Sequence, residues 1–321
     1  MSPRALFDVP APAKLNLFLH IVGRRSDGYH LLESVLALID WADNLHFERR
    51  DDGRISRHDL GPALPADDLC LRAARTLQFA SGTRLGVDIS IHKHVPWGAG
   101  MGGGSSDAAS TLLALNRLWG LHWPRQRLAQ LGLSLGADVP FFIGGDNAFV
   151  QGIGEQLTPV VLRASHYAVV KPPASIATRD IFEHPALKRD TPPLVDADII
   201  LGSLESGVES GLIAAKQPGT GLVALPGTNP GTNPGANDLQ MAAEDRCAEV
   251  SAAARWLEAR FGNSRMTGSG SAVFSRVGKF ECDGGMTELQ MASFPAPDLP
   301  VGWLGRMCMG LQQHPLKHWA G

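Results

Sequence analysis

The sequence predicts a protein of mixed helices and strands that is divided into two domains. Its 321 residues are more than a single hydrophobic core usually contains. Strands are predicted where apolar side chains alternate with others, as over Ala13 to Ile21 and Val87 to Ile91. A helix is predicted where apolar residues recur at helical spacing, as from Ala108 to Trp119. We place the boundary after residue 165, which gives domains 1–165 and 166–321.

The composition limits the classes of ligand. Hydrophobic residues at 44% and charged residues at 19% are typical of a globular protein. A net charge of −3 argues against a nucleic-acid or membrane surface, so we expect small-molecule ligands. The four cysteines are scattered, which indicates reduced thiols rather than a zinc site or disulfides. Without a signal peptide or membrane-length apolar run, we expect a cytoplasmic protein, as a monomer or weak homodimer.

The first predicted strand, Ala13 to Ile21, presents two polar side chains on one face. Its odd-numbered apolar residues, from Leu15 to Ile21, are expected to face the core together. Lys14 and Asn16 then project from the opposite face, about 7 Å apart along the strand. This pair indicates either a solvated strand face or two groups that share a ligand.

A turn follows this strand at Arg24 to His30, with Asp27-Gly28 as its signal. Tyr29 and His30 lie at the exit of the turn. An aromatic ring beside a histidine can stack on a nucleobase and hydrogen-bond to it. The same two residues are also typical of an ordinary hairpin, so the local pattern leaves both interpretations open.

The next elements lead to a glycine-rich stretch. A strand is predicted over Asn44 to Arg49, a helix capped by aspartate over Asp67 to Ala80, and another strand over Val87 to Lys93. His92 and His94 share one face of the last strand, but no carboxylate or cysteine neighbours them. We therefore do not expect them to bind a metal.

The glycine-rich stretch, Pro96 to Ala109, predicts a phosphate-binding loop. It follows a strand and precedes a helix, so glycines can bring backbone N–H groups close to an anion at the positive end of that helix. The two serines are expected to cap the helix and to offer hydroxyls. The candidate nucleotide-binding residues of the loop are Pro96, Trp97, Gly98, Ala99, Gly100, Met101, Gly102, Gly103, Gly104, Ser105 and Ser106.

Other phosphate loops fit this stretch poorly. A Walker A loop requires a lysine after its last glycine, and none follows here. The dinucleotide fingerprint is formally present at Gly98, Gly100 and Gly103, but no acidic residue occurs from Ala108 to Ala137 to hold a ribose. The downstream motifs of protein kinases are also missing.

The residues after the loop include a candidate catalytic carboxylate. A helix is predicted over Arg125 to Leu135 and ends at Gly136. Asp138 follows that end directly and precedes Pro140 and two phenylalanines. An acid held in this way is fixed and partly desolvated, which suits a general base; the alternative is an aspartate that ends the helix in a turn.

The second half of the chain carries weaker signals. We expect a strand at Tyr167 to Lys171, a flexible inserted loop at Gln217 to Ala236, and a helix with a possible break from Asn237 to Phe261. A second glycine turn, containing Thr267, Gly268, Ser269 and Gly270, leads into a strand and can bind an anion through its N–H groups. The last strand is expected from Trp303 to Gly310.

Seven segments in one order resemble a known family. The glycine loop is similar to the central motif of the GHMP kinases, named after galactokinase, homoserine kinase, mevalonate kinase and phosphomevalonate kinase. Taken together, the segments resemble the 4-diphosphocytidyl-2-C-methyl-D-erythritol kinases within that superfamily. The segments are residues 12–17, 25–30, 96–109, 135–140, 152–155, 237–238 and 267–270.

The resemblance implies an α+β fold of two domains with a deep cleft: an N-terminal ATP-binding domain like ribosomal protein S5 domain 2, and a C-terminal substrate-binding domain. It also implies a reaction, in which ATP phosphorylates the 2-hydroxyl of 4-diphosphocytidyl-2-C-methyl-D-erythritol for isoprenoid synthesis. A kinase for another alcohol, such as homoserine or mevalonate, is the alternative, but those substrates carry no base for Tyr29 and His30 to bind.

The resemblance also implies roles for single residues. Asp138 and Lys14 match the catalytic pair, and a carboxylate kept ionised by an ammonium group can accept the proton of an alcohol. Lys93 matches a lysine that approaches ATP, and Mg²⁺ is expected with the nucleotide, with Ser106 as its candidate ligand. The implied substrate-binding residues are Asn16, Tyr29, His30, Thr267, Gly268, Ser269 and Gly270.

Overall fold

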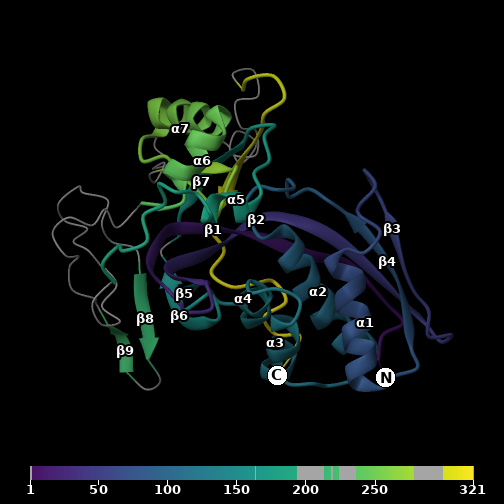
Figure 1. Ribbon diagram of the computed structural model, residues 1–321. Helices are drawn as coiled ribbons and strands as arrows, with labels where there is room; N and C mark the ends of the chain where they lie inside the picture. The colour runs from purple at the N-terminus through teal and green to yellow at the C-terminus, as the bar shows by residue number, and fades with distance from the viewer. Residues whose placement is uncertain are drawn as a thin grey trace, which may run out of the picture.

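Strand pairing arranges the chain as two β-sheets (Figure 1). The computed structural model describes residues 2–162, 164–193, 213–217, 220–223, 236–277 and 299–320. The larger sheet has the order β3-β4-β2-β5-β6-β8-β9, with β1 paired to β2. Its strands are β1 (Ala5–Arg24), β2 (His30–Arg50), β3 (Ile55–Asp59), β4 (Gly86–His92), β5 (Ala148–Gln151), β6 (Gln156–Leu162), β8 (Ile213–Gln217) and β9 (Thr220–Val223).

The smaller sheet has the order β10-β11-β7-β12, and all its pairs are antiparallel. Its strands are β7 (His166–Lys171), β10 (Arg265–Met266), β11 (Val273–Val277) and β12 (Leu304–Met309). Helices α1 to α4 gather by the larger sheet, and α6 and α7 lie against the smaller one (Figure 1). The helices are α1 (Leu69–Ser81), α2 (Gly103–Leu118), α3 (Arg125–Leu133), α4 (Val139–Gly144), α5 (Thr178–Phe182), α6 (Gln240–Arg246) and α7 (Ala248–Phe261).

The long hairpin β1–β2 belongs to both halves of the molecule. Leu15 and Leu17 of β1 pack in one apolar cluster, whereas Leu19 and Ile21 pack in another with α6, α7 and β7. The expectation that these four leucine and isoleucine residues share one face is therefore wrong. A register shift between Asn16 and Leu19 breaks the alternation, because a bulge adds a residue to one strand and rotates the following side chains.

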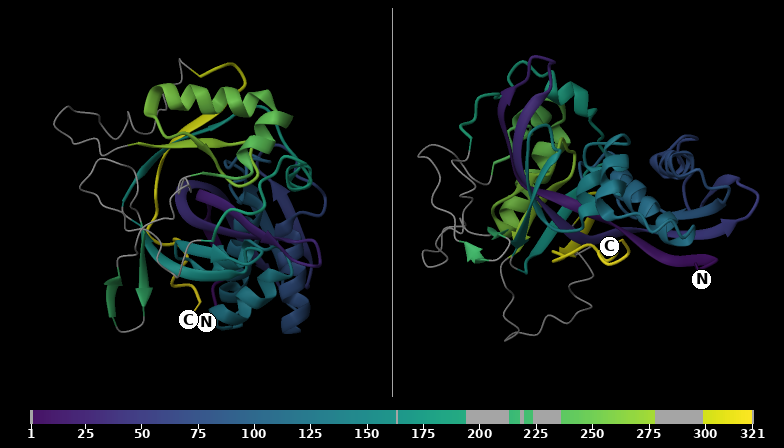
Figure 2. Two further views of the ribbon diagram at one scale, coloured as in Figure 1. Left: turned by 60° about the vertical axis from the view of Figure 1, so that its left-hand side comes forward. Right: turned by 90° about the horizontal axis from the view of Figure 1, so that it is seen from below.

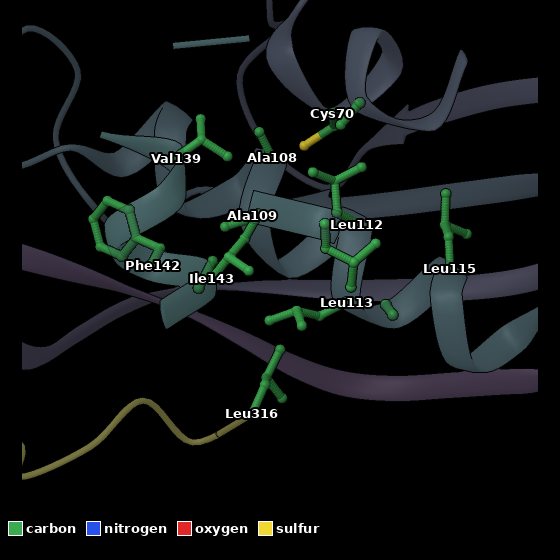
Figure 3. Packing of buried hydrophobic residues seen from close by; sticks show 14 of the residues in the cluster. Cys70, Ala108, Ala109, Leu112, Leu113, Leu115, Val139, Phe142, Ile143 and Leu316 are labelled. Atoms are coloured by element: carbon green, nitrogen blue, oxygen red, sulfur yellow. The ribbon is translucent and has the colours of Figure 1, made fainter. Parts of the chain in front are cut away.

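Helix α2 forms the centre of the largest apolar cluster. Ala109 and Leu113 of α2 lie near Ile143 of α4, and Leu115 lies further along α2 in the same cluster (Figure 3). Leu316, from the end of the chain, packs in the same cluster. Because so much of α2 is buried, its N-terminal end, which carries the glycine loop, is held firmly against the sheet.

The last residues return to the larger sheet. Asn147 donates from Nδ2 to the carbonyl of Leu311 at 2.8 Å, and Arg125 donates from Nη2 to that of Ala320 at 3.2 Å. Ser2 and Trp319 line one surface cavity, so the two ends of the described chain lie near each other (Figure 2). The domain boundary after residue 165 stays a prediction.

Most expected elements are confirmed, and two further details are wrong. Part of the expected loop at Gln217 to Ala236 is strand β9, which pairs antiparallel with β8 because its threonine, leucine and valine suit an extended chain; residues 224–235 lie outside the described residues. The serines do not cap α2, because the helix begins earlier, after Gly102. Among the helices described, none combines the length and apolar character needed to cross a membrane.

Candidate active site

The glycine loop between β4 and α2 is shaped by three glycines in the left-handed region. Gly98, Gly100 and Gly102 have φ angles of 61°, 72° and 71°, a conformation that strains residues with a side chain. Gly102 precedes the first turn of α2, whose N–H groups have no acceptor within the helix. These donors and the helix dipole make the end of α2 an anion site.

The second glycine turn packs directly against the first. A Cβ atom on Gly100 would lie 2.2 Å from the carbonyl oxygen of Thr267, and one on Gly268 would lie 2.7 Å from that of Gly100. Ser271 donates its backbone N–H to the carbonyl of Gly98 at 3.1 Å. Two segments far apart in the sequence thus approach through their backbones, and only glycine allows this contact.

A first cavity, of about 370 Å³, lies beside the glycine loop. This volume is within the usual range of small-molecule sites. Apolar side chains, including Leu64, Leu69 and Met101, form part of its wall, and Trp97 is 64% exposed beside them. Gly103, at the start of α2, is also part of the lining. The cavity therefore has an apolar side suited to a base and an amide-rich side suited to phosphates.

Lys93 lines this cavity and is held by two carboxylates. Its Nζ forms ion pairs with Asp43 and Asp107, and both of these acids are buried. Burial acts to lower the pKa of Lys93, but the two carboxylates outweigh it and leave the pKa raised. Burial also raises the pKa of Asp107, and Lys93 opposes that shift. Asp43 further accepts the N–H groups of His94 and Val95, so the strand end that carries Lys93 is fixed.

A second cavity, also of about 370 Å³, meets the first at the start of α2. Gly100, Gly102 and Ser105 line both cavities. Lys14 and Asp138 line the second cavity only. A group bound at the shared residues would therefore lie between the nucleotide-sized cavity and the acid–lysine pair.

Lys14 and Asn16 form a buried polar network. Lys14 donates from Nζ to Oδ1 of Asn16. Asn16 donates from Nδ2 to Oγ of Ser34 at 2.8 Å, and its backbone N–H donates to Oγ1 of Thr267 at 2.9 Å. Burial lowers the pKa of Lys14, and the charge of Asp138 opposes that shift. The bonds also fix the Asn16 amide, since its oxygen faces the ammonium group.

Asp138 occupies the position before the short helix α4. Its side chain makes no capping hydrogen bond to that helix, which leaves the carboxylate free to line the cavity. Pro140 favours the start of a helix and the buried Phe141 and Phe142 anchor it. The local sequence therefore fixes the acid at the cavity wall, as expected from the pattern.

Thr178 and Phe182 of α5 also line the second cavity, together with Gly268 and Ser269. The His30 ring lies 5.1 Å from the Phe182 ring, but His30 itself does not line the cavity. Tyr29 is 61% exposed and does not line it either. The sequence reasoning missed Phe182, because nothing in the weakly helical stretch around it distinguishes it.

One further predicted residue lies outside both cavities, and a residue without a predicted role supports the second glycine turn. Ser106, the expected metal ligand, is fully buried and lines neither cavity, whereas Ser105 lines both. Asn237 is buried and donates from Nδ2 to the carbonyls of Met266 and Gly268, both at 2.8 Å, so it supports the second glycine turn. No cluster of three or more possible metal-binding His, Cys, Asp or Glu residues occurs among the described residues.

This fold and glycine loop define a class of small-molecule kinase. The GHMP kinase N terminal domain model matches residues 68–146, which include the loop and Asp138. A crystal structure of a homoserine kinase from Cytophaga hutchinsonii has a TM-score of 0.62 over 97% of this chain and 96% of its own, at 15% identity, and so shares the fold.

The particular family follows from closer relatives. The 4-diphosphocytidyl-2-C-methyl-D-erythritol kinase of Methylibium petroleiphilum is 56% identical over the full length of both chains, and that of Polaromonas naphthalenivorans is 50% identical over 98% of this chain and 96% of its own. A crystal structure of 4-(cytidine 5'-diphospho)-2C-methyl-D-erythritol kinase, at 31% identity, has a TM-score of 0.71 and covers 94% of this chain and 98% of its own. The chain belongs to the 4-diphosphocytidyl-2-C-methyl-D-erythritol kinase family.

Proposed function

We propose that this protein transfers the γ-phosphoryl group of ATP to the 2-hydroxyl of 4-diphosphocytidyl-2-C-methyl-D-erythritol. The names of its relatives give the substrate. The observation that supports the reaction is the meeting of two cavities at Gly100, Gly102 and Ser105, with Lys14 and Asp138 in one of them. ATP occupies the first cavity, and its terminal phosphate lies at the start of α2.

The acid–lysine pair carries the proton transfer. Asp138 accepts the proton of the 2-hydroxyl while the hydroxyl oxygen bonds to the γ-phosphorus and the bond to the β-phosphate oxygen breaks. The ammonium of Lys14 offsets charge on the phosphoryl group during its transfer. Asn16 holds Lys14 in place, and the N–H groups at the start of α2 bind the phosphates.

The residues at the junction of the cavities fit a magnesium ion. Mg²⁺ prefers oxygen ligands and is usually held by one or two carboxylates together with the phosphates of its nucleotide. The hydroxyl of Ser105 and the carboxylate of Asp138 are oxygen donors on this wall. We propose that these two residues, rather than the buried Ser106, would hold it, and that it would neutralise phosphate charge.

The cytidyl end of the substrate lies by α5 in this proposal. Phe182 supplies a ring for the base, His30 lies next to it, and the exposed Tyr29, directly before His30 in the chain, would supply a second ring. The second glycine turn, at Gly268 and Ser269, borders the same cavity. We also propose that residues 1–165 bind the nucleotide and that residues 166–321 complete the substrate site.

The first test is an ATP-dependent phosphorylation assay on the purified protein. The cytidyl substrate is compared with homoserine and mevalonate, and Asp138→Asn serves as the inactive control. We expect turnover of the cytidyl compound alone and its loss in the variant. Turnover of another alcohol would keep the phosphoryl-transfer chemistry but would remove the cytidyl assignment, and ATP binding without any turnover would contradict the kinase proposal.

A further inference from the structure

Arg189 joins the helix at the cytidyl end of the second cavity to His30. Its Nη2 donates to the carbonyls of Phe182 and His184 at 3.1 and 3.0 Å, and its Nη1 donates to that of Leu187 at 3.0 Å. Its Nε donates to Nε2 of the His30 ring at 3.1 Å. Among the described residues, no carboxylate forms an ion pair with Arg189. All four of these hydrogen bonds of the guanidinium group therefore go to uncharged acceptors, three carbonyls and one imidazole nitrogen.

The contact between Arg189 and His30 determines where the imidazole carries its hydrogen. A guanidinium group has only donors and keeps its charge at any ordinary pH. Nε2 of His30 must therefore be the bare, accepting nitrogen, and the ring hydrogen lies on Nδ1. No described residue accepts a hydrogen bond from this Nδ1, which leaves its hydrogen available to a ligand.

The surrounding charges favour the neutral ring. Burial lowers the pKa of His30, and the positive charges of Arg189 and Arg24 lower it further. Arg24 lies on β1, where its Nε donates to the carbonyl of Gly28 at 3.0 Å, and Arg189 lies after α5. A second proton on His30 would lie on Nε2 and point at the Nε–H of Arg189, so two hydrogen-bond donors would face each other. The ring therefore presents one donor, on Nδ1, and no acceptor to a bound base.

We propose that Arg189 is a positioning residue that sets base specificity, because it fixes His30 with its hydrogen on Nδ1. This proposal rests on the proposed cytidyl substrate. Cytosine has an acceptor at N3, so an Nδ1–H donor that faces N3 can bind it. Uracil carries a hydrogen on N3, so the same donor would meet another donor there. The other tautomer of His30 would reverse this preference.

The test compares three variants with the wild type. Arg189→Met keeps an unbranched, mainly apolar side chain but removes the guanidinium group and every donor. Arg189→Lys keeps the charge and one flexible donor, and it serves if the methionine variant does not fold. Arg179→Met is the control, because Arg179 lies on the neighbouring helix α5 but is exposed and pairs with Glu183.

Two readouts separate base specificity from a general role in stability. The ratio of kcat/KM between the cytidyl substrate and its uridyl counterpart measures specificity. Nitrogen-15 NMR of histidine reports the tautomer of His30 without any turnover, and a His30→Gln variant identifies the signal. We expect the wild type to carry its hydrogen on Nδ1, and Arg189→Met to lose that tautomer and lower the ratio about tenfold or more. Arg179→Met should leave both readouts unchanged.

Each contrary outcome overturns a different statement. A wild-type His30 with its hydrogen on Nε2 would overturn the proposal whatever the activity. An unchanged ratio in both Arg189 variants would show that Arg189 does not set specificity, while the kinase function would stand. A wild type that phosphorylates neither the cytidyl nor the uridyl compound would overturn the proposed function, and base specificity through Arg189 with it.

Discussion

The two cavities that meet at the start of α2 differ in the groups that line them: backbone groups predominate in one and side chains in the other. The nucleotide cavity is formed largely by one continuous stretch, from Lys93 to Asp107, in which backbone groups predominate. The substrate cavity is formed by side chains from β1, β2, β5 and α5, and by Asp138 just before α4. We infer that the first is sensitive to the addition of a methyl group on a glycine, whereas the second is sensitive to the loss of a single charge.

The largest expected effect is in the substrate cavity. Asp138→Asn removes the proposed base but keeps its shape, so kcat should fall by about 10²-fold or more. The affinity for ATP measured without Mg²⁺ should change little, because Asp138 does not line the nucleotide cavity. Steady-state rates and equilibrium ATP binding measure the two quantities. Asp180→Asn, which alters an exposed acid, is the control; a parallel loss of ATP affinity in Asp138→Asn would contradict the separation of the cavities.

The second effect is in the glycine loop. Gly100→Ala would place Cβ 2.2 Å from the carbonyl oxygen of Thr267 at a φ of +72°, so we expect unfolding to become easier by about 1–3 kcal/mol. Gly104→Ala is the matched control, because its Cβ would meet only Leu69 Cδ1, at 3.4 Å. Since alanine favours a helix over glycine, this control should be as stable as the wild type or more so. Urea unfolding measures the free energy of unfolding of both variants. Equal stability of the two would show that the loop can change its conformation to accept a side chain at position 100.

The sequence predicts these two cavities unequally. The glycine loop is contiguous, so its place between a strand and a helix can be derived from local pattern, and Asp138 is similarly fixed by its neighbours. Which of Ser105 and Ser106 faces the cavity is harder to predict, because it depends on the residue at which the helix begins. Helix boundaries vary by one or two residues. Here α2 begins at Gly103, which turns Ser106 into the interior.

Contacts between segments that are distant in the sequence cannot be predicted from local sequence patterns. Thr267 accepts the N–H of Asn16 across 251 positions, and Arg189 donates to His30 across 159. Such pairs depend on how the two sheets pack, which periodicity does not report. The register shift after Asn16 is a further example, since it overrides an alternation that is regular in the sequence.

The third prediction concerns pH and the substrate cavity alone. Because burial lowers the pKa of Lys14, its ammonium should lose its proton at a pH below the ordinary value of 10.5. Activity needs the charged form, so kcat should fall as the pH rises through that lowered pKa. The same shift has the opposite sign for stability: between the two pKa values the unfolded chain binds more protons, so the free energy of unfolding rises with pH.

Rates measured from about pH 7 to 10 locate this alkaline limb. In Lys14→Arg the limb should move out of the range, because arginine stays charged, although kcat itself should be lower. A limb that is the same in the arginine variant would assign it to another group. The KM for ATP should show no such limb if the nucleotide cavity is independent of Lys14.

The smallest expected effect is on the apolar wall of the nucleotide cavity. Trp97 is 64% exposed in the structure and lies beside the glycine loop, where its ring can stack on the base of ATP. Trp97→Leu keeps an apolar side chain but loses the aromatic face, so the KM for ATP should rise roughly fivefold, with kcat nearly unchanged. Trp256→Leu, on α7, is the matched control. Quenching of tryptophan fluorescence by ATP should disappear in Trp97→Leu and persist in the control. Quenching that survives in Trp97→Leu would place the base elsewhere and would leave the backbone of the loop as the main source of nucleotide affinity.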